Sequence, residues 1–202
     1  MDNIKTSFEQ YKRLLAIAEA GLYYAKDPFD QERYEEMKSI SLSLLSQDQD
    51  EIKKKITFSL EKEEGYPTPK VDVRAYIKKE GKVLLIEDKQ TKEWALPGGF
   101  AEIGRSPKEN IQKEVKEETG LTVTVDRLLA VFDTDLRKDV PQVFQYYKLV
   151  FSCSVLDGSF IENIETSSSG FFSLEDLPRL SEKRTTEEQL MILERENLPY
   201  VE

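Results

Sequence analysis

The hydrophobic pattern of this chain changes period at one charged segment that is rich in glycine and proline, Glu61–Lys70. Before this segment, apolar residues recur at spacings of three and four, as they do along one side of an amphipathic helix. After it, apolar residues alternate with polar ones or form short runs, which is typical of β-strands. The glycine and two prolines of the segment stop any helix inside it. We therefore predict a helical domain over residues 1–66 and a second domain over residues 67–202.

The N-terminal part is expected to contain two helices and a third short helical piece. The apolar stripe of the first helix consists of Ile4, Phe8, Tyr11, Leu15, Ala18 and Leu22, and that of the second consists of Tyr34, Met37, Ile40 and Leu44 or Leu45. Asp27-Pro28 and Asp30 mark a break and an N-cap between these helices, and the third piece covers residues 49–60. About sixty residues of helix bury too small a core to be stable alone. We expect this domain to pack on another surface, and its long apolar stripe predicts a homodimer.

The C-terminal part is predicted to contain strands around one central helix, with another helix near the end. The strands are expected at Val71–Ile77, Lys82–Ile86, Leu121–Val125, Leu128–Phe132 and Val143–Val155. The helices are expected at Pro107–Thr119 and Thr186–Glu196, and Glu80-Gly81 suggests a turn between the first two strands. This order indicates an α/β or α+β sandwich.

Charge and hydropathy exclude several classes of function. The chain has 29 Lys and Arg against 39 Asp and Glu, a net charge of −10, and its longest basic run is Lys53–Lys55. A surface that binds duplex DNA needs a dense basic patch, so we do not expect DNA binding. No apolar run approaches the roughly eighteen residues of a membrane span, and Met1–Gln10 lacks the pattern of a secretory signal. We expect a soluble, cytoplasmic protein with no membrane partner.

The chain contains no histidine and a single cysteine, Cys153. The absence of histidine excludes Ser-His-Asp and Cys-His catalysis and histidine-ligated zinc. One cysteine excludes an intrachain disulfide and a cysteine-rich metal site. Any chemistry must therefore depend on carboxylates, Lys, Arg, Tyr, Ser or a bound metal.

A loop with two glycines, Gly98-Gly99, precedes a helix that ends in a cluster of glutamates. Glu114 lies three and four residues before Glu117 and Glu118, so the three carboxylates share one side of the helix and repel one another. Neighbouring lysines would neutralise part of that charge, and Mg²⁺ or Mn²⁺ would neutralise it better because both prefer oxygen ligands. On spacing alone, a solvated acidic face is the simpler interpretation, since Glu is a common exposed helix former.

Loop and helix together resemble the Nudix box of hydrolases that act on nucleoside diphosphates linked to another moiety. The residues in register with the box are Gly99, Glu114, Val115, Glu117, Glu118, Gly120 and Leu121. The flanking Trp94-Ala95-Leu96-Pro97 and Gly170-Phe171-Phe172 agree with this resemblance. The chain departs from the box twice, because Arg105 stands where the family has Glu and Lys113 where it has Arg.

The resemblance implies an α/β (α+β) Nudix sandwich, with a mixed sheet packed between helices and a small all-α N-terminal domain before it. The subgroup with such a domain hydrolyses X-linked nucleoside diphosphates, as ADP-ribose and CDP-choline pyrophosphatases do, and there the N-terminal domain helps form a homodimer and can border the pocket. The alternative is a Nudix-fold sensor that binds a nucleotide without cleaving it. Such regulators usually carry a basic DNA-binding module, whereas residues 1–66 contain ten basic and fourteen acidic side chains.

The resemblance also assigns roles to individual residues. Glu114, Glu117 and Glu118 would hold Mg²⁺ or Mn²⁺, together with the Gly98 carbonyl, although a glycine pair can also be a plain turn. The general base would come from the box, as Glu117, or from a downstream acidic loop, where we favour Glu165 over an ordinary surface role.

Arginines and aromatic residues are the candidates for substrate contacts. Arg74 is the most plausible phosphate contact outside the box, with a surface salt bridge as the alternative, and Arg105 is a second candidate. We expect Glu109 to pair with both Arg105 and Lys113 at helical spacing, in place of the missing Glu–Arg pair. Glu102 would be a further ligand or would orient the loop. Possible base-stacking residues, which could equally be core, are Phe100, Phe144, Tyr146 and Tyr147.

Overall fold

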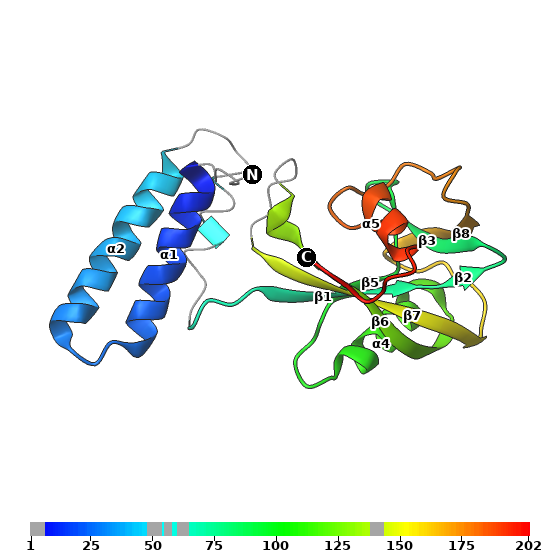
Figure 1. The fold of residues 1–202 in the computed structure, drawn as a ribbon, viewed down its shortest axis with the longest axis horizontal. Coiled ribbons are helices and arrows are strands. Elements are labelled where there is room, and N and C mark those ends of the chain that lie inside the picture. Colours follow the sequence, from blue (N-terminus) through cyan, green and yellow to red (C-terminus); the bar gives the residue numbers. More distant parts are fainter. Residues whose placement is uncertain (1–6, 48–53, 55–57, 60–64, 138–143) are drawn as a thin grey trace. The chain divides into compact units, whose positions relative to one another are not determined.

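A computed structural model describes residues 7–47, 54, 58–59, 65–137 and 144–202. The chain divides into two compact units (Figure 1). The first consists of Met1–Pro69 with Pro141–Gln145, and the second of Lys70–Val140 with Tyr146–Glu202. Each unit is described by itself below.

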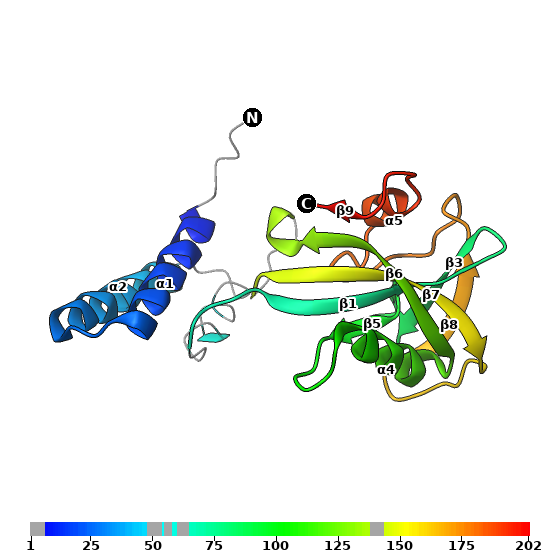
Figure 2. The same cartoon turned by 60° about the horizontal axis from the view of Figure 1, so that its bottom comes forward.

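The first unit contains two helices that lie side by side, α1 (Ser7–Tyr24) and α2 (Pro28–Ser46) (Figures 1 and 2). Helix α2 begins at Pro28, and its N-cap is Asp27, whose carboxylate accepts hydrogen bonds from the amides of Phe29 at 2.7 Å and Asp30 at 3.3 Å. The expectation that Asp30 is the N-cap is therefore wrong. Proline is favoured at the first helical position, because no intrahelical N–H bond is lost there. With Pro28 at that position, the N-cap is the residue just before it, Asp27.

The facing sides of α1 and α2 follow the predicted apolar stripes with one exception. Leu15, Ala18 and Leu45 are buried, but Ile40 is 52% exposed and Ser41 is buried in its place. A Cβ atom on Gly21 would lie 2.3 Å from the ring of Tyr34, so the glycine lets that ring pack closely on α1. The predicted third helical piece at 49–60 lies largely outside the described residues.

The second unit contains a mixed five-stranded sheet of order β5-β1-β7-β6-β9 and a smaller sheet in which β3 pairs with β2, β4 and β8. Within the larger sheet, β1 and β7 are parallel, as are β6 and β9. The strands are β1 (Lys70–Tyr76), β2 (Lys78–Lys79), β3 (Lys82–Asp88), β4 (Trp94–Ala95), β5 (Gly98–Phe100), β6 (Thr122–Asp133), β7 (Tyr146–Asp157), β8 (Thr166–Phe172) and β9 (Tyr200–Val201). The helices are α4 (Pro107–Thr119), the 3-10 helix η1 (Thr134–Leu136) and α5 (Glu187–Leu193).

One strand prediction needs correction. Strand β6 is continuous from Thr122 to Asp133, although two separate strands were expected at 121–125 and 128–132. Its pairing with β7 shifts register between Val125 and Arg127 and again between Leu128 and Ala130. A β-bulge adds a residue to one strand without ending the ladder, so the break in alternation marks irregular pairing within one strand.

Two hydrophobic clusters hold this unit together. One contains Ile111 and Val115 of α4 with Val73 and Ala75 of β1. The other contains Leu190, Ile192 and Leu193 of α5 with strand residues such as Phe132. Successive residues of a strand point to opposite faces, so β1 contributes to both clusters. Figure 2 shows α4 and α5 on opposite sides of the larger sheet. The predicted α/β sandwich, with a mixed sheet between helices, is confirmed.

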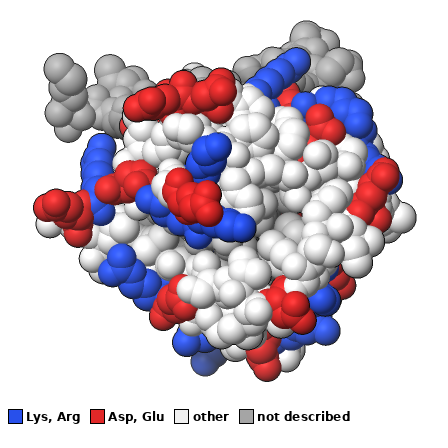
Figure 3. All heavy atoms as spheres, turned by 90° about the vertical axis from the view of Figure 1, so that its right-hand side faces the viewer, with Lys and Arg blue, Asp and Glu red and all other residues white. Residues whose placement is uncertain are grey.

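The surface of the second unit carries both signs of charge. On the face drawn in Figure 3, the described basic and acidic side chains are interspersed, with no single continuous basic field. None of the described helices combines the length and apolar character needed to cross a lipid bilayer.

Candidate active site

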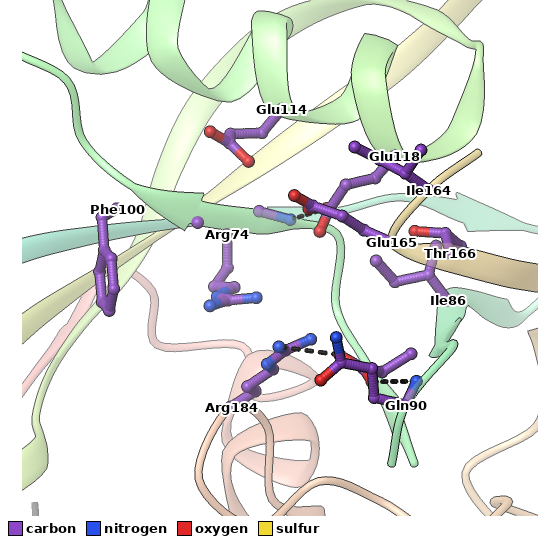
Figure 4. A pocket seen from close by; sticks show the side chains of 13 residues that line it. Arg74, Ile86, Gln90, Phe100, Glu114, Glu118, Ile164, Glu165, Thr166 and Arg184 are labelled. Carbon is purple, nitrogen blue, oxygen red and sulfur yellow. Dashed lines mark hydrogen bonds and ion pairs between the residues drawn. The ribbon is translucent and has the colours of Figure 1, made fainter. Parts of the chain in front are cut away.

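A cavity of about 440 Å³ lies entirely within the second unit (Figure 4). Its lining comes from α4, from strands β1, β3 and β5, and from the segments around β8 and before α5. The lining residues are Arg74, Ile86, Asp88, Gln90, Gly98, Gly99, Phe100, Glu114, Glu118, Ile164, Glu165, Thr166 and Arg184. The structure therefore brings together five of the seven predicted site residues, all except Arg105 and Glu117.

Helix α4, which carries the glutamates, has the predicted bounds because both of its ends are capped. Ser106 and Glu109 form a reciprocal capping box at the start, and Gly120 ends the helix with a φ of 75°. The Glu109 carboxylate accepts hydrogen bonds from the amide and the hydroxyl of Ser106, both at 2.7 Å, which lower its pKa. The predicted pairs of Glu109 with Arg105 and Lys113 are therefore wrong, because the Glu109 carboxylate is hydrogen-bonded to Ser106 in the N-terminal cap instead.

Glu118 is buried and lines the cavity, into which its side chain points from α4 (Figure 4). Its Oε2 accepts a hydrogen bond of 2.6 Å from the amide of Gly98. Burial raises the pKa of Glu118 to about 7, while Arg74 and the Gly98 hydrogen bond lower it and Glu114 raises it. The carboxyl group is thus largely removed from water, and among the described residues it has one hydrogen bond and no direct ion pair.

Glu114 is half-buried one turn before Glu118 and faces the glycine loop. Burial raises its pKa, Lys113 opposes this rise, and Glu117 and Glu165 add to it. A Cβ atom on Gly99 would lie 2.7 Å from Oε2 of Glu114. Gly98 is more restricted still, because it has a φ of 139° and a Cβ there would lie 2.0 Å from the Val73 carbonyl oxygen. Both glycines allow the backbone to lie directly beside the carboxylates.

Glu117, Arg105 and Lys113 lie on the outer side of this region. Lys113 pairs with Glu117, whose side chain is 56% exposed, and also with Glu102 at 3.2 Å. Arg105 pairs with the same Glu102. Within the described part of the chain, no three acidic, histidine or cysteine side chains converge into a ready ligand cluster. These outer residues form an exposed network of ion pairs instead.

Arg74 is buried at the cavity, and so it is not part of a surface salt bridge. Its Nε and Nη2 donate to the two carboxylate oxygens of Asp72 at 3.0 and 2.9 Å, and its Nη1 donates to the carbonyl of Leu96 at 3.1 Å. The sequence analysis missed Asp72, although spacing of i and i+2 places both side chains on one face of a strand. The pair holds the guanidinium plane fixed beside Glu118.

A second arginine of the cavity was also missed. Arg184, in the segment before α5, pairs with Asp88 at the end of β3 at 2.9 Å (Figure 4). Beneath it, the buried Lys148 donates a hydrogen bond to the Arg184 carbonyl. Burial, and next the charge of Arg74, lower the pKa of Lys148 to about 7. No local spacing links these residues, so only the folded chain brings them together.

The remaining wall of the cavity carries Glu165, which lies just before β8 and points toward the α4 carboxylates (Figure 4). The amide of Lys89 donates to the Glu165 carbonyl at 2.8 Å. At the opposite end, Phe100 lines the cavity and is 63% exposed. Its ring stacks on Tyr146 with centroids 5.0 Å apart and an angle of 10° between the planes.

The donor set of the cavity fits a hard divalent cation. Glu114 is half-buried and Glu118 is buried, burial raises the pKa of both, and Glu114 raises the pKa of Glu118 further. Carboxylate oxygens are the ligands that Mg²⁺ and Mn²⁺ prefer, and a bound cation would relieve this repulsion. The Gly98 amide donates to Glu118, which places the backbone of the glycine loop beside this carboxyl group.

Comparison with known families covers most of the chain. Residues 68–193 match the NUDIX domain, and residues 5–58 match a domain described as UDP-X-like, N-terminal oligomerisation domain.

Individual relatives extend this similarity. YjhB of Bacillus subtilis (strain 168), provisionally named an ADP-ribose pyrophosphatase, is 44% identical over 185 residues, which are 92% of this chain and 89% of that protein. An ADP-ribose pyrophosphatase of Methanocaldococcus jannaschii is 36% identical over 125 residues, 60% of this chain and 72% of that protein. The crystal structure of a UDP-X diphosphatase is 43% identical with a TM-score of 0.66, over 96% of this chain and 97% of that one. The chain is thus similar along nearly its whole length to a protein of solved structure.

Proposed function

This chain belongs to the NUDIX family and is a Nudix pyrophosphohydrolase; from that premise we propose that it hydrolyses the pyrophosphate bond of a nucleoside diphosphate linked to another moiety. The products would be a nucleoside monophosphate and a phosphorylated second product. ADP-ribose is the first candidate substrate, because relatives carry that name. CDP-choline and UDP-linked conjugates are the next candidates, the latter because of the UDP-X diphosphatase.

One observation supports this proposal above the others. A single cavity is lined by two box carboxylates, Glu114 and Glu118, by a third carboxylate from a different segment, Glu165, and by two arginines, Arg74 and Arg184. Pyrophosphate hydrolysis needs positive charge at the phosphate oxygens and a proton acceptor for water. Groups of both kinds line this one cavity, which supports the proposal.

We propose that Glu114, Glu118 and the Gly98 carbonyl hold Mg²⁺, with Mn²⁺ as the alternative. Bound there, the cation would supply positive charge at the phosphate oxygens and lower the pKa of a water molecule. Glu117 would join these ligands only by leaving its ion pair with Lys113. The chain's own residues orient the substrate and accept the proton, as follows.

Arg74 is the residue we propose for contact with a substrate phosphate. Three of its five N–H donors are bonded to Asp72 and Leu96, and two remain for phosphate oxygens. Because Asp72 holds the guanidinium rigidly, little conformational entropy is lost on binding. Arg105 lies outside the cavity lining, so we propose it only as a contact for substrate groups that extend beyond the cavity.

Glu165 is the proposed general base, with Glu117 as the alternative from the box. The Glu165 carboxylate lies on the cavity wall near Glu114 and raises the pKa of that residue. A general base must reach the attacking water within hydrogen-bond distance, directly or through one further water. Glu165 can accept that proton without competing for a place in the α4 ligand set.

We further propose that the first unit forms a homodimer. Its described helices expose several large apolar side chains, Leu14, Ile17, Tyr24 and Phe29 among them, each at least 40% exposed. The matching family is described as an oligomerisation domain. The full chain should have the mass of a dimer in solution at micromolar concentration, and Ile17→Glu should shift it toward monomer. A monomeric mass for the unmodified chain contradicts the proposal.

The activity is tested by incubating the pure protein with Mg²⁺ and a panel of ADP-ribose, CDP-choline, UDP-glucose and a nucleoside triphosphate. We expect a nucleoside monophosphate from at least one diphosphate conjugate, and no turnover when EDTA replaces Mg²⁺. Tight binding of a conjugate without any product would instead identify a nucleotide sensor. Preferential cleavage of the triphosphate would overturn the proposed substrate class while leaving the reaction type intact.

A further inference from the structure

The side chain of Asn163 connects two segments of the site that are far apart along the chain. Its Nδ2 donates to the carbonyl oxygens of Glu117 and Glu118, both at 3.0 Å. Its Oδ1 accepts from the amides of Glu165 at 2.9 Å and Thr166 at 2.8 Å. One half-buried amide group thus bonds the end of helix α4 on one side and the Glu165 backbone on the other.

The two sets of backbone groups that this side chain contacts, the carbonyls of α4 and the amides of the loop, suit an asparagine and not a charged side chain. The last carbonyl groups of a helix have no intrahelical partner, and the negative end of the helix dipole favours a donor there. The two amides of the loop need an acceptor. Asn presents both functions from one short, planar group, and only one orientation of its amide satisfies all four contacts.

The backbone of Glu165 is held from the other side as well. The Lys89 amide donates to the Glu165 carbonyl at 2.8 Å, and the Asn163 amide donates to the Thr166 carbonyl at 3.2 Å. Thr166 is buried and begins β8. Glu165 therefore has a fixed backbone but an exposed side chain, which is the arrangement expected of a group that must reach into a cavity from a rigid support.

We propose that Asn163 is a positioning residue that fixes Glu165 relative to the end of α4, and thereby sets the distance between the proton acceptor and the α4 carboxylates. This inference rests on the proposed function, since it concerns how the proposed base is placed. A displacement of about 1 Å in a reacting group can lower a rate by about a hundredfold. The hydrogen bonds of Asn163 therefore affect the rate of hydrolysis, because they fix the position of Glu165 relative to α4.

A double-mutant cycle tests the inference through kcat. We expect Asn163→Ala to lower kcat about tenfold or more with little change in KM, and Glu165→Gln to lower kcat about a hundredfold or more. In the Glu165→Gln background, Asn163→Ala should change kcat by less than about threefold, because the group that it positions is already lost. An equal loss in both backgrounds would show a merely structural role and overturn the inference.

Two single variants serve as matched controls. Asn163→Asp keeps the acceptor for the loop amides but places a negative oxygen against the two helix carbonyls. If the connection to α4 matters, this variant should be as slow as Asn163→Ala; recovery of wild-type kcat would mean that only the local turn matters, and would overturn the inference. Glu162→Gln removes the neighbouring ion pair with Lys89 and should leave kcat near wild type.

Amide hydrogen exchange provides a readout that does not depend on turnover. Asn163→Ala should speed exchange at the amides of Glu165 and Thr166, whereas Glu162→Gln should not. Unchanged exchange overturns the inference whatever the activity. If Asn163→Ala exchanges faster but the wild type turns over no conjugate, the proposed function is overturned. The structural connection made by Asn163 would still stand. Full activity of Glu165→Gln would overturn the base assignment and with it the role of Asn163.

Discussion

The two sides of helix α4 carry the same kinds of residue in opposite environments. On the cavity side, Glu118 is 7% exposed and Glu114 is half-buried, and burial raises the pKa of both. On the outer side, Glu117 is paired with Lys113 in solvent, and the same lysine also contacts Glu102. Exposed pairs of this kind contribute little to stability, whereas desolvated carboxylates are costly unless a cation neutralises them.

The difference shows that position around the helix, rather than residue type, determines what each glutamate can do. A glutamate whose charge is already neutralised by a lysine on the outer side of the helix gains little from a bound cation. A glutamate held away from water and facing other carboxylates gains a great deal. Substitutions on the two sides should therefore have effects of different size, and the following predictions are ordered from the largest to the smallest.

The largest effect is expected for Glu118→Gln. The amide is isosteric and its oxygen still accepts the Gly98 hydrogen bond, so the fold should persist. The anionic ligand is lost, and kcat should fall on the order of a thousandfold, because charge stabilisation at the phosphates supplies several kcal/mol. Steady-state kinetics on the true substrate measure this. Wild-type turnover by the variant would mean that the cavity side of α4 is not the metal side.

The same variant should gain stability in a pH-dependent way when EDTA is present. The pKa of Glu118 is about 7 in the folded protein and lower in the unfolded chain, so the folded state binds more protons between these values. This carboxylate therefore lowers stability as the pH rises through that window. In thermal unfolding, the midpoint temperature of Glu118→Gln should be several degrees higher than that of wild type at pH 8. At pH 5 the difference should be much smaller. An equal shift at both pH values would show that burial of charge is not the cause.

A smaller loss is expected for Glu117→Gln, the same chemical change one residue earlier. The outer carboxylate must leave Lys113 before it can act as a ligand or base, so its removal should lower kcat about tenfold to a hundredfold. Comparison with Glu118→Gln under identical conditions gives the contrast between the two sides. Equal losses would show that Glu117 enters the ligand set fully once the cation binds.

The smallest effect is expected for Arg105→Glu, which restores the glutamate of the family box. Arg105 lies outside the cavity lining and pairs with Glu102, to which Lys113 is also bonded. Activity should change by no more than about tenfold in either direction, and unfolding stability by less than about 1 kcal/mol. A gain or loss of a hundredfold would assign the outer side of α4 a direct part in substrate binding.

Much of the backbone structure around the site was predictable from short-range sequence patterns. The bounds of α4, the glycine pair before it and the spacing of its glutamates follow from helix signals and from the register of the box. The partner of Glu109 was predictable in the same way, because Ser106 lies three residues before it at the spacing of a capping box, but the prediction followed the ion-pair spacing to Arg105 and Lys113 instead. Helix caps satisfy otherwise unpaired backbone amides, which outweighs an exposed ion pair.

Sequence by itself determined the family resemblance, the helical and strand periods, and the set of carboxylates from which a metal site could be built. Only the tertiary structure decided that Glu118 is buried while Glu117 is not, that Asp88 holds Arg184, and that Asn163 joins α4 to Glu165. Periodicity is a property of neighbours within one or two helical turns. Desolvation and the choice of hydrogen-bond partner depend instead on which distant segments the folded chain brings against each side chain, and no spacing along the sequence records that.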